Sequence, residues 1–96
     1  MNYTFEHEEA GAKGTFSLIN EDKIVARMTY SRLDSNNIIV DHTAVDPNSK
    51  GEGHGKAIVE QLVLRARGND QKVMPLCPFA KGVIEKNSDW RDILRK

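Results

Sequence analysis

Residues 41–67 read DHTAVDPNSKGEGHGKAIVEQLVLRAR, and this stretch decides how the rest of the chain is interpreted. Residues 38–45 are rich in β-branched and apolar side chains and predict a strand, which the turn residues at 46–48 would end. From Lys56 onward, apolar residues recur at intervals of three and four and predict an amphipathic helix. Gly68 is expected to end this helix as a left-handed C-cap.

The loop between this strand and this helix has glycine at every second position, in Lys50-Gly51-Glu52-Gly53-His54-Gly55. A helix N-terminus presents free N–H groups and a partial positive charge, and both attract phosphate. Glycine lets the backbone approach such an anion closely, and Lys50 and Lys56 can add charge to it. The sequence therefore predicts a phosphate or pyrophosphate site at residues 50–56, with a plain turn as the alternative interpretation.

The loop fits neither of the two commonest phosphate-binding motifs. A P-loop requires serine or threonine after its Gly-Lys pair, whereas Ala57 follows Gly55-Lys56. The dinucleotide fingerprint requires a third glycine three residues after the second, at a position that Lys56 or Ile58 occupies here. A different anion loop is therefore predicted.

The other elements are predicted from the alternation of apolar and polar residues and from the turn residues between them. The pattern predicts three strands that form an antiparallel meander, at residues 3–7, 15–19 and 23–32. Ile24 is expected on the apolar face of the third strand. After the helix, residues 72–76 predict a strand parallel to residues 38–45, because a helix connects the two.

Two short helical segments are predicted at the end of the chain. Pro78 suits the first turn of a helix at residues 79–86, because its missing N–H would be unpaired there in any case. Ser88 can cap a last turn whose apolar side chains anchor the chain, namely Trp90, Ile93 and Leu94.

Composition predicts one soluble domain over residues 1–96, since a chain of this length has no room for a second core. No apolar run approaches the ~18 residues of a membrane span, and the acidic N-terminus is unlike a signal peptide. The net charge of zero argues against nucleic-acid binding. One cysteine cannot form an internal disulfide, so the cytoplasm is expected. A monomer is expected, and the spacing of the histidines and the cysteine predicts no metal site.

The lysine and glycine pattern of residues 50–55, between a strand and a helix, resembles the acetyl-CoA loop of the GNAT superfamily of N-acetyltransferases. Two further motifs resemble its small single-domain, YjdJ-type subgroup: Asp41-His42-Thr43 and Pro75-Leu76-Cys77-Pro78-Phe79-Ala80-Lys81. The resemblance covers roughly residues 20–95 and implies an α/β (α+β) fold in a minimal form. An antiparallel meander would lead into a central strand, the glycine loop, a helix, a parallel strand that splays away, and short C-terminal helices.

The resemblance also implies that the chain binds acetyl-CoA or CoA. In this family the pantetheine arm enters the gap between two splayed strands, which would explain a proline at position 75, because the ladder is already open there. Val45 would bind the pantetheine amides, and Pro78, Phe79 and Lys81 would line the cofactor. The pyrophosphate would be held by Lys50, Gly51, Glu52, Gly53, His54, Gly55 and Lys56, although the family usually has an aliphatic residue at the position of His54.

Cys77 and His42 are the candidate catalytic residues. Cys77 precedes a helix whose N-terminal partial charge favours the thiolate and lowers the pKa, and an ordinary buried cysteine is the alternative. His42 is expected on the same face of its strand as Val40 and Ala44, with Asp41 on the opposite face. It could deprotonate an incoming amine or the cysteine, or it could be a core histidine.

The general acid is where this chain departs from the family. Many members place a tyrosine after the second conserved helix, whereas the tyrosines here are Tyr3 and Tyr30, both early in the chain. This departure favours Cys77 as the catalytic group. The function implied by the resemblance is acetyl transfer from acetyl-CoA to an unidentified amine, either a small molecule or a protein. Cys77 would act as nucleophile or acid and His42 as base. A CoA-binding module without turnover and a protein-interaction domain are the alternatives.

Overall fold

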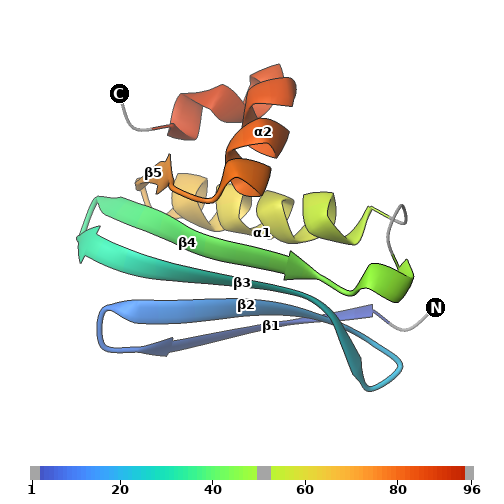
Figure 1. Ribbon diagram of the computed structural model, residues 1–96. Helices are drawn as coiled ribbons and strands as arrows, with labels where there is room; N and C mark the ends of the chain where they lie inside the picture. Colours follow the sequence, from blue (N-terminus) through green and yellow to red (C-terminus); the bar gives the residue numbers. More distant parts are fainter. Residues whose placement is uncertain (1–2, 50–52, 95–96) are drawn as a thin grey trace.

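The computed structural model describes residues 3–49 and 53–94, which form a mixed sheet with helices packed beside it (Figure 1). The strands are β1 (Tyr3–Ala10), β2 (Lys13–Asn20), β3 (Lys23–Asp34), β4 (Asn37–Val45) and β5 (Lys72–Pro75). The helices are α1 (His54–Gly68) and α2 (Pro78–Lys86), and the short 3-10 helices are η1 (Pro47–Ser49) and η2 (Ser88–Ile93).

The described strands lie in the sheet in the same order as in the chain, from β1 to β5. Short turns join the first four strands, so each pairs antiparallel with the next. β5 pairs with β4 in parallel, because α1 carries the chain back along the sheet before β5 begins. The predicted meander, the parallel fifth strand and the α+β fold class are therefore confirmed.

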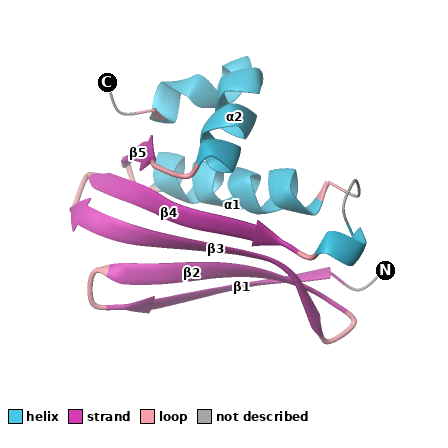
Figure 2. Ribbon diagram, viewed as in Figure 1, coloured by secondary structure: helices cyan, strands magenta, loops and turns pink. Residues whose placement is uncertain are grey.

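The core lies between one face of the sheet and the helices, which all lie on the same side of it (Figure 2). α1 packs over β2 and β3, and α2 packs next to β4 and β5. The apolar stripe predicted for α1 is fully buried and consists of Ile58, Val59, Leu62, Val63 and Ala66. No described helix covers the other face of the sheet, so that face is open to solvent.

A bulge in β3 corrects the face predicted for Ile24. Leu18 pairs with Ala26 and the next residue, Ile19, pairs with Ile24, so Val25 is an extra residue in β3. The bulge turns Val25 into the core, where it is 5% exposed, and leaves Ile24 46% exposed. The strict alternation that placed Ile24 on the apolar face does not continue through the bulge.

A second bulge, in β4, corrects the face predicted for His42. Thr29 pairs with His42 and Tyr30 pairs with Val40, so Asp41 is the extra residue. Val40 is buried, whereas Asp41 and His42 are both exposed. His42 therefore does not share the face of Val40, and Asp41 does not point into the core.

The predicted caps at two helix ends were also wrong. Gly68 is the last residue of α1, and the left-handed residue after the helix is Asp70, with a φ of 58°. Asn69 caps the helix, because its Nδ2 donates to the carbonyl of Arg65 at 2.8 Å. At η2, Asn87 occupies the N-cap position predicted for Ser88, and its side chain makes no capping hydrogen bond to η2.

A part-buried polar cluster attaches the edge strand β1 to the rest of the sheet. The hydroxyl of Tyr30 donates to Glu9 at 2.7 Å and is also hydrogen-bonded to His7. Burial, and then Glu9, raise the pKa of Tyr30, so its hydroxyl stays protonated and can donate. The hydrogen bond from Tyr30 in turn lowers the pKa of Glu9. These contacts fix β1 at the end of the strand that is far from Tyr3.

Candidate active site

The pairing between β4 and β5 ends partway along β4, and the part of β4 without this pairing is called the opening between the two strands. β5 pairs with β4 only from Asn37 to Val40, and the N–H of Leu76 donates one more hydrogen bond to the carbonyl of Val40 at 3.1 Å. Residues 41–45 of β4 then continue without β5 beside them. Pro75 pairs with Val40 and the N–H of Leu76 still bonds to β4 beyond it, so the ladder is not yet open at the proline as predicted; its missing N–H is tolerated because β5 is the edge strand of the sheet.

The Cys77 thiol lies at this opening, after β5 and immediately before the first residue of α2. The backbone N–H groups of Ala80, Phe79 and Thr43 and the hydroxyl of Thr43 are near its sulfur and favour its charged form. Burial by itself raises the pKa of the Cys77 thiol, but these polar groups outweigh burial and hold the pKa below its ordinary value. The lowered pKa agrees with the effect predicted for a helix N-terminus and favours the thiolate.

Thr43 is the site residue that sequence reasoning missed. Thr43 is 9% exposed, and its hydroxyl, which makes no hydrogen bond to a described residue, lies close enough to Cys77 to help lower the pKa of the thiol. The bulge at Asp41 brings Thr43 to the covered face of the sheet. The Asp41-His42-Thr43 motif was the feature of the sequence that could have pointed to Thr43. The alternation of apolar and polar residues gave no reason to choose Thr43 over its two neighbours in the motif.

His42 lies on the open face of β4, directly across from Thr29 on β3. The strand backbone separates it from the covered face, where Thr43 meets the Cys77 sulfur. The geometry therefore gives no support to His42 as the base that deprotonates Cys77. It leaves His42 exposed to a molecule that arrives from the open face of the sheet. Asp41 lies beside it and accepts a hydrogen bond from the Ser31 hydroxyl at 2.8 Å.

The glycine loop is described only in its second half, because the predicted site residues Lys50, Gly51 and Glu52 lie outside the described residues. Gly53 has a φ of 79°, a left-handed conformation that glycine adopts readily, and α1 begins at the next residue. The free N–H groups of the first turn of α1 therefore follow directly on this left-handed residue.

Gly55 is the point where three predicted site residues come together. A Cβ at Gly55 would lie 2.3 Å from Cζ of Phe79 and 3.2 Å from Cγ2 of Val45. The Phe79 ring from α2 thus rests against the backbone of the first turn of α1, next to the end of β4. A side chain at position 55 would displace the Phe79 ring. Packing against Phe79 is therefore enough to require glycine at this position.

The two described lysines predicted to bind the cofactor occupy different positions. Lys56 is exposed in the first turn of α1, and its Nζ lies 6.0 Å from the centroid of the Trp90 ring. Lys81 is exposed on α2, and its backbone N–H donates to the carbonyl of Cys77 at 3.0 Å. Pro78 is the first residue of α2, as predicted.

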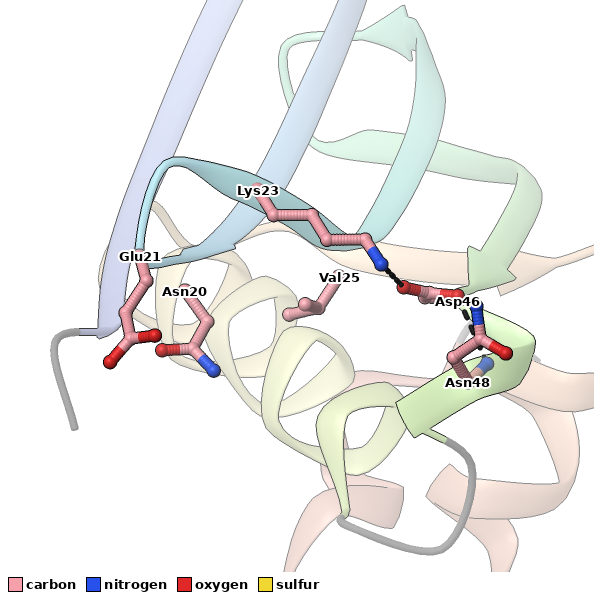
Figure 3. Close-up of a pocket in the computed structure, with 6 residues that line it drawn as sticks. All are labelled: Asn20, Glu21, Lys23, Val25, Asp46 and Asn48. Atoms are coloured by element: carbon pink, nitrogen blue, oxygen red, sulfur yellow. Dashed lines mark hydrogen bonds and ion pairs between the residues drawn. The ribbon is translucent and has the colours of Figure 1, made fainter.

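Asp46 fixes the point where β4 ends and the loop begins. Its Oδ2 lies 2.7 Å from Nζ of Lys23, and its Oδ1 accepts a hydrogen bond from the N–H of Asn48 at 3.0 Å (Figure 3). The contact with Lys23 is the main cause that lowers the pKa of Asp46, so the carboxylate stays charged. These residues line a shallow pocket of about 260 Å³, together with Asn20, Glu21 and Val25.

Comparison with known proteins identifies the family to which this arrangement belongs. The profile of the GCN5-related N-acetyl-transferases (GNAT) matches residues 15–93. A GCN5-like protein of Staphylococcus aureus with a known solution structure is 30% identical, and the match covers 94% of this chain and 87% of that chain with a TM-score of 0.68. The chain belongs to the GNAT family.

Larger GNAT structures share the fold at lower sequence identity. The ribosomal-protein-S18-alanine N-acetyltransferase of Escherichia coli is 18% identical, with a TM-score of 0.70 over 81% of this chain and 53% of that chain. A GNAT family acetyltransferase of Elizabethkingia anophelis with acetyl-CoA bound is 13% identical, with a TM-score of 0.67 over 77% of this chain and 64% of that chain. This chain thus spans less than two thirds of these two proteins. No curated protein matches the chain.

The described parts of this GNAT domain show neither a membrane helix nor a metal cluster. In residues 3–49 and 53–94, no helix is both long enough and apolar enough to cross a bilayer. Within the same ranges, no three His, Cys, Asp or Glu side chains lie together so that they could hold a metal ion.

Proposed function

We propose that this GNAT domain binds acetyl-CoA and transfers the acetyl group to an amine. The observation that carries the proposal is the position of Cys77, at the N-terminus of α2 and next to the opening between β4 and β5. A thiol in such a place reacts as a thiolate, and a thioester that entered along the unpaired part of β4 would meet it.

The residues around the opening fit an elongated donor with an anionic end. The unpaired backbone of β4 near Val45 offers hydrogen bonds to the amides of a pantetheine arm. The N–H groups of the first turn of α1 offer an anion site for the diphosphate, and the Phe79 ring lies between these two regions. Together, the β4 backbone, the first turn of α1 and the Phe79 ring support binding of CoA and its thioester.

Two roles for Cys77 follow from the same position. As nucleophile, the thiolate would attack the thioester carbonyl carbon, form a new C–S bond to Cys77, and release CoA, whose sulfur takes up a proton. The amine would then attack the acetyl carbon, form a C–N bond and regenerate the Cys77 thiolate. As acid, a protonated Cys77 would instead give its proton to the departing CoA sulfur after direct attack by the amine. The lowered pKa of Cys77 favours the first role.

The acceptor would approach from the open face of the sheet. His42 is exposed on that face, where it could take a proton from the attacking amine, and it stays our candidate for the base. No described helix covers this face of the sheet, so an amine on the surface of a protein could reach it as well as a small molecule could. A role that depends on a free thiol also fits the cytoplasm, where cysteines stay reduced.

Mass spectrometry of the protein after incubation with acetyl-CoA tests the proposal. Trypsin releases residues 73–81, in which Cys77 is the only internal nucleophilic side chain. We expect one added acetyl group on this peptide, which hydroxylamine removes because it is a thioester. A panel of primary amines and peptides, each added with acetyl-CoA, reports turnover.

The other outcomes of this experiment separate the roles. Turnover of an amine without an acetylated peptide 73–81 would point to Cys77 as acid. CoA binding without either acetylation or turnover would contradict the transferase proposal and leave a binding module. Absence of CoA binding would contradict the proposed function as a whole and would favour a protein-interaction domain.

A further inference from the structure

The edge strand β1 contacts α1 near both ends of the helix, although the two elements lie far apart in the chain. At the N-terminal end of α1, the Tyr3 hydroxyl lies 3.0 Å from Nε2 of His54. Towards its C-terminal end, Arg65 donates to Oε1 of Glu9 at 3.1 Å. The first contact involves the residue that directly precedes Gly55, so β1 reaches the proposed anion site.

His54 is buried at the first position of α1 and has one ring nitrogen without a partner. Its side chain is 4% exposed, and the Tyr3 ring packs edge-on against it with 5.4 Å between the ring centroids. Among the described residues, Nδ1 has no hydrogen-bond partner. If the Tyr3 hydroxyl donates to Nε2, Nδ1 carries the ring proton and is a buried donor without an acceptor. Such a donor is costly to leave unpaired, unless an anion at the helix N-terminus accepts from it.

We propose that Tyr3 is a positioning residue for anion binding, because its hydroxyl holds the His54 imidazole so that Nδ1 and the free N–H groups of the first turn of α1 face the CoA diphosphate together. The inference deepens the proposed function and rests on it. It gives a use to a histidine at a position where the family usually has an aliphatic residue. It also gives the exposed edge strand a role at the site, which the chain order alone does not suggest.

The Tyr3 hydroxyl can be removed without disturbing the fold. Its side chain is 39% exposed, so removal of the hydroxyl leaves no cavity and little lost burial. The other half of β1 is held by the separate cluster of Tyr30, His7 and Glu9, so the strand stays paired when the Tyr3 hydroxyl is absent. A change in ligand affinity can therefore be measured in a folded protein.

Isothermal titration calorimetry of Tyr3→Phe tests the proposal with two ligands. CoA carries the diphosphate, whereas acetyl-pantetheine carries the same arm without it. We expect Tyr3→Phe to weaken CoA binding by about two- to tenfold, the range set by one hydrogen bond of ordinary net strength. Acetyl-pantetheine affinity and the melting temperature should stay close to those of the wild type.

Glu9→Gln is the matched control, because it weakens the other contact between β1 and α1. It should lower the melting temperature and leave CoA affinity unchanged, since Arg65 lies far along the helix from its first turn. Tyr3→Phe and His54→Leu together should weaken CoA binding no more than His54→Leu alone, because the hydroxyl acts through the imidazole.

Three results would overturn the inference in different ways. Wild-type CoA affinity in Tyr3→Phe would refute the positioning role while the proposed function stands. An equal loss for CoA and acetyl-pantetheine would show that the hydroxyl acts on the whole site and would also refute it. A wild-type protein that binds neither ligand would refute the proposed function and, with it, this inference.

Discussion

Replacement of Cys77 by serine is expected to reduce acetyl uptake and acetyl transfer at least ~100-fold while leaving CoA affinity unchanged. The hydroxyl of serine fits the same N–H groups, but it does not ionise near neutral pH and is a poor nucleophile there. The glycine loop and the opening between β4 and β5 do not depend on the sulfur. Quantification of acetylated peptide 73–81 and of the acetylated acceptor, together with calorimetry of CoA binding, measures both parts of this prediction.

The pH dependence of alkylation checks the physical cause. Because hydrogen bonds lower the pKa of Cys77, its reaction with iodoacetamide should have a midpoint below the ~8.5 of a free cysteine, and the rate should fall as the pH drops through that midpoint. Thr43→Val removes the hydroxyl and should move the midpoint upward. Cys77→Ala should lower stability by only about 1 kcal/mol. A free-thiol midpoint, combined with full transfer by Cys77→Ser, would exclude Cys77 as nucleophile.

CoA at about 100 times its dissociation constant should stabilise the fold by about 2.7 kcal/mol. For a domain of this size, this corresponds to a rise of roughly 10–20 °C in melting temperature. Gly53→Val should remove most of this gain, because valine is strained at a φ of 79° and the turn before α1 would change. Scanning calorimetry with and without CoA measures the shift for both proteins.

Gly53→Asn separates backbone strain from anion binding. Asparagine tolerates the left-handed conformation, and among the described residues no atom beyond the chain neighbours lies within 4 Å of a Cβ at this position, so this variant should keep most of the CoA-dependent stabilisation. Lys56→Ala should weaken CoA binding and reduce its salt dependence, since the lysine contributes charge. A wild-type melting temperature that does not respond to saturating CoA would refute donor binding.

Local sequence patterns were enough to predict the fold and the place of the thiol. Alternation identified the strands, the three-and-four spacing identified α1, and Cys77 before Pro78 identified a thiol at a helix start. Each of these features depends on neighbours within a few residues. The family resemblance supplied the donor, and the match to residues 15–93 confirms the family.

The features that sequence reasoning missed depend on contacts between distant segments. An extra residue such as Asp41 reverses every later side chain of its strand, and the sequence carries no local mark of a bulge. That single insertion exchanged the faces of His42 and Thr43. Tyr3 is 51 positions away from His54, and only the arrangement of the sheet and the helix brings the two side chains together.

The sequential order of the strands in the sheet has a consequence for how the protein folds. Each of the first four strands needs only a short hairpin turn to find its neighbour, and such local pairings form quickly. The pairing of β5 with β4 must wait for the whole of α1 to cross over, so it closes the longest loop in the sheet.

This late pairing is also short, since it includes only the four residues of β5. We therefore expect β5 to separate from β4 more readily than β4 separates from β3. Amide hydrogen exchange would show this as earlier loss of the Leu76 proton than of those between β3 and β4, and the reverse order would contradict it. The pairing beside Cys77 would then be the last part of the sheet to form and the first to open.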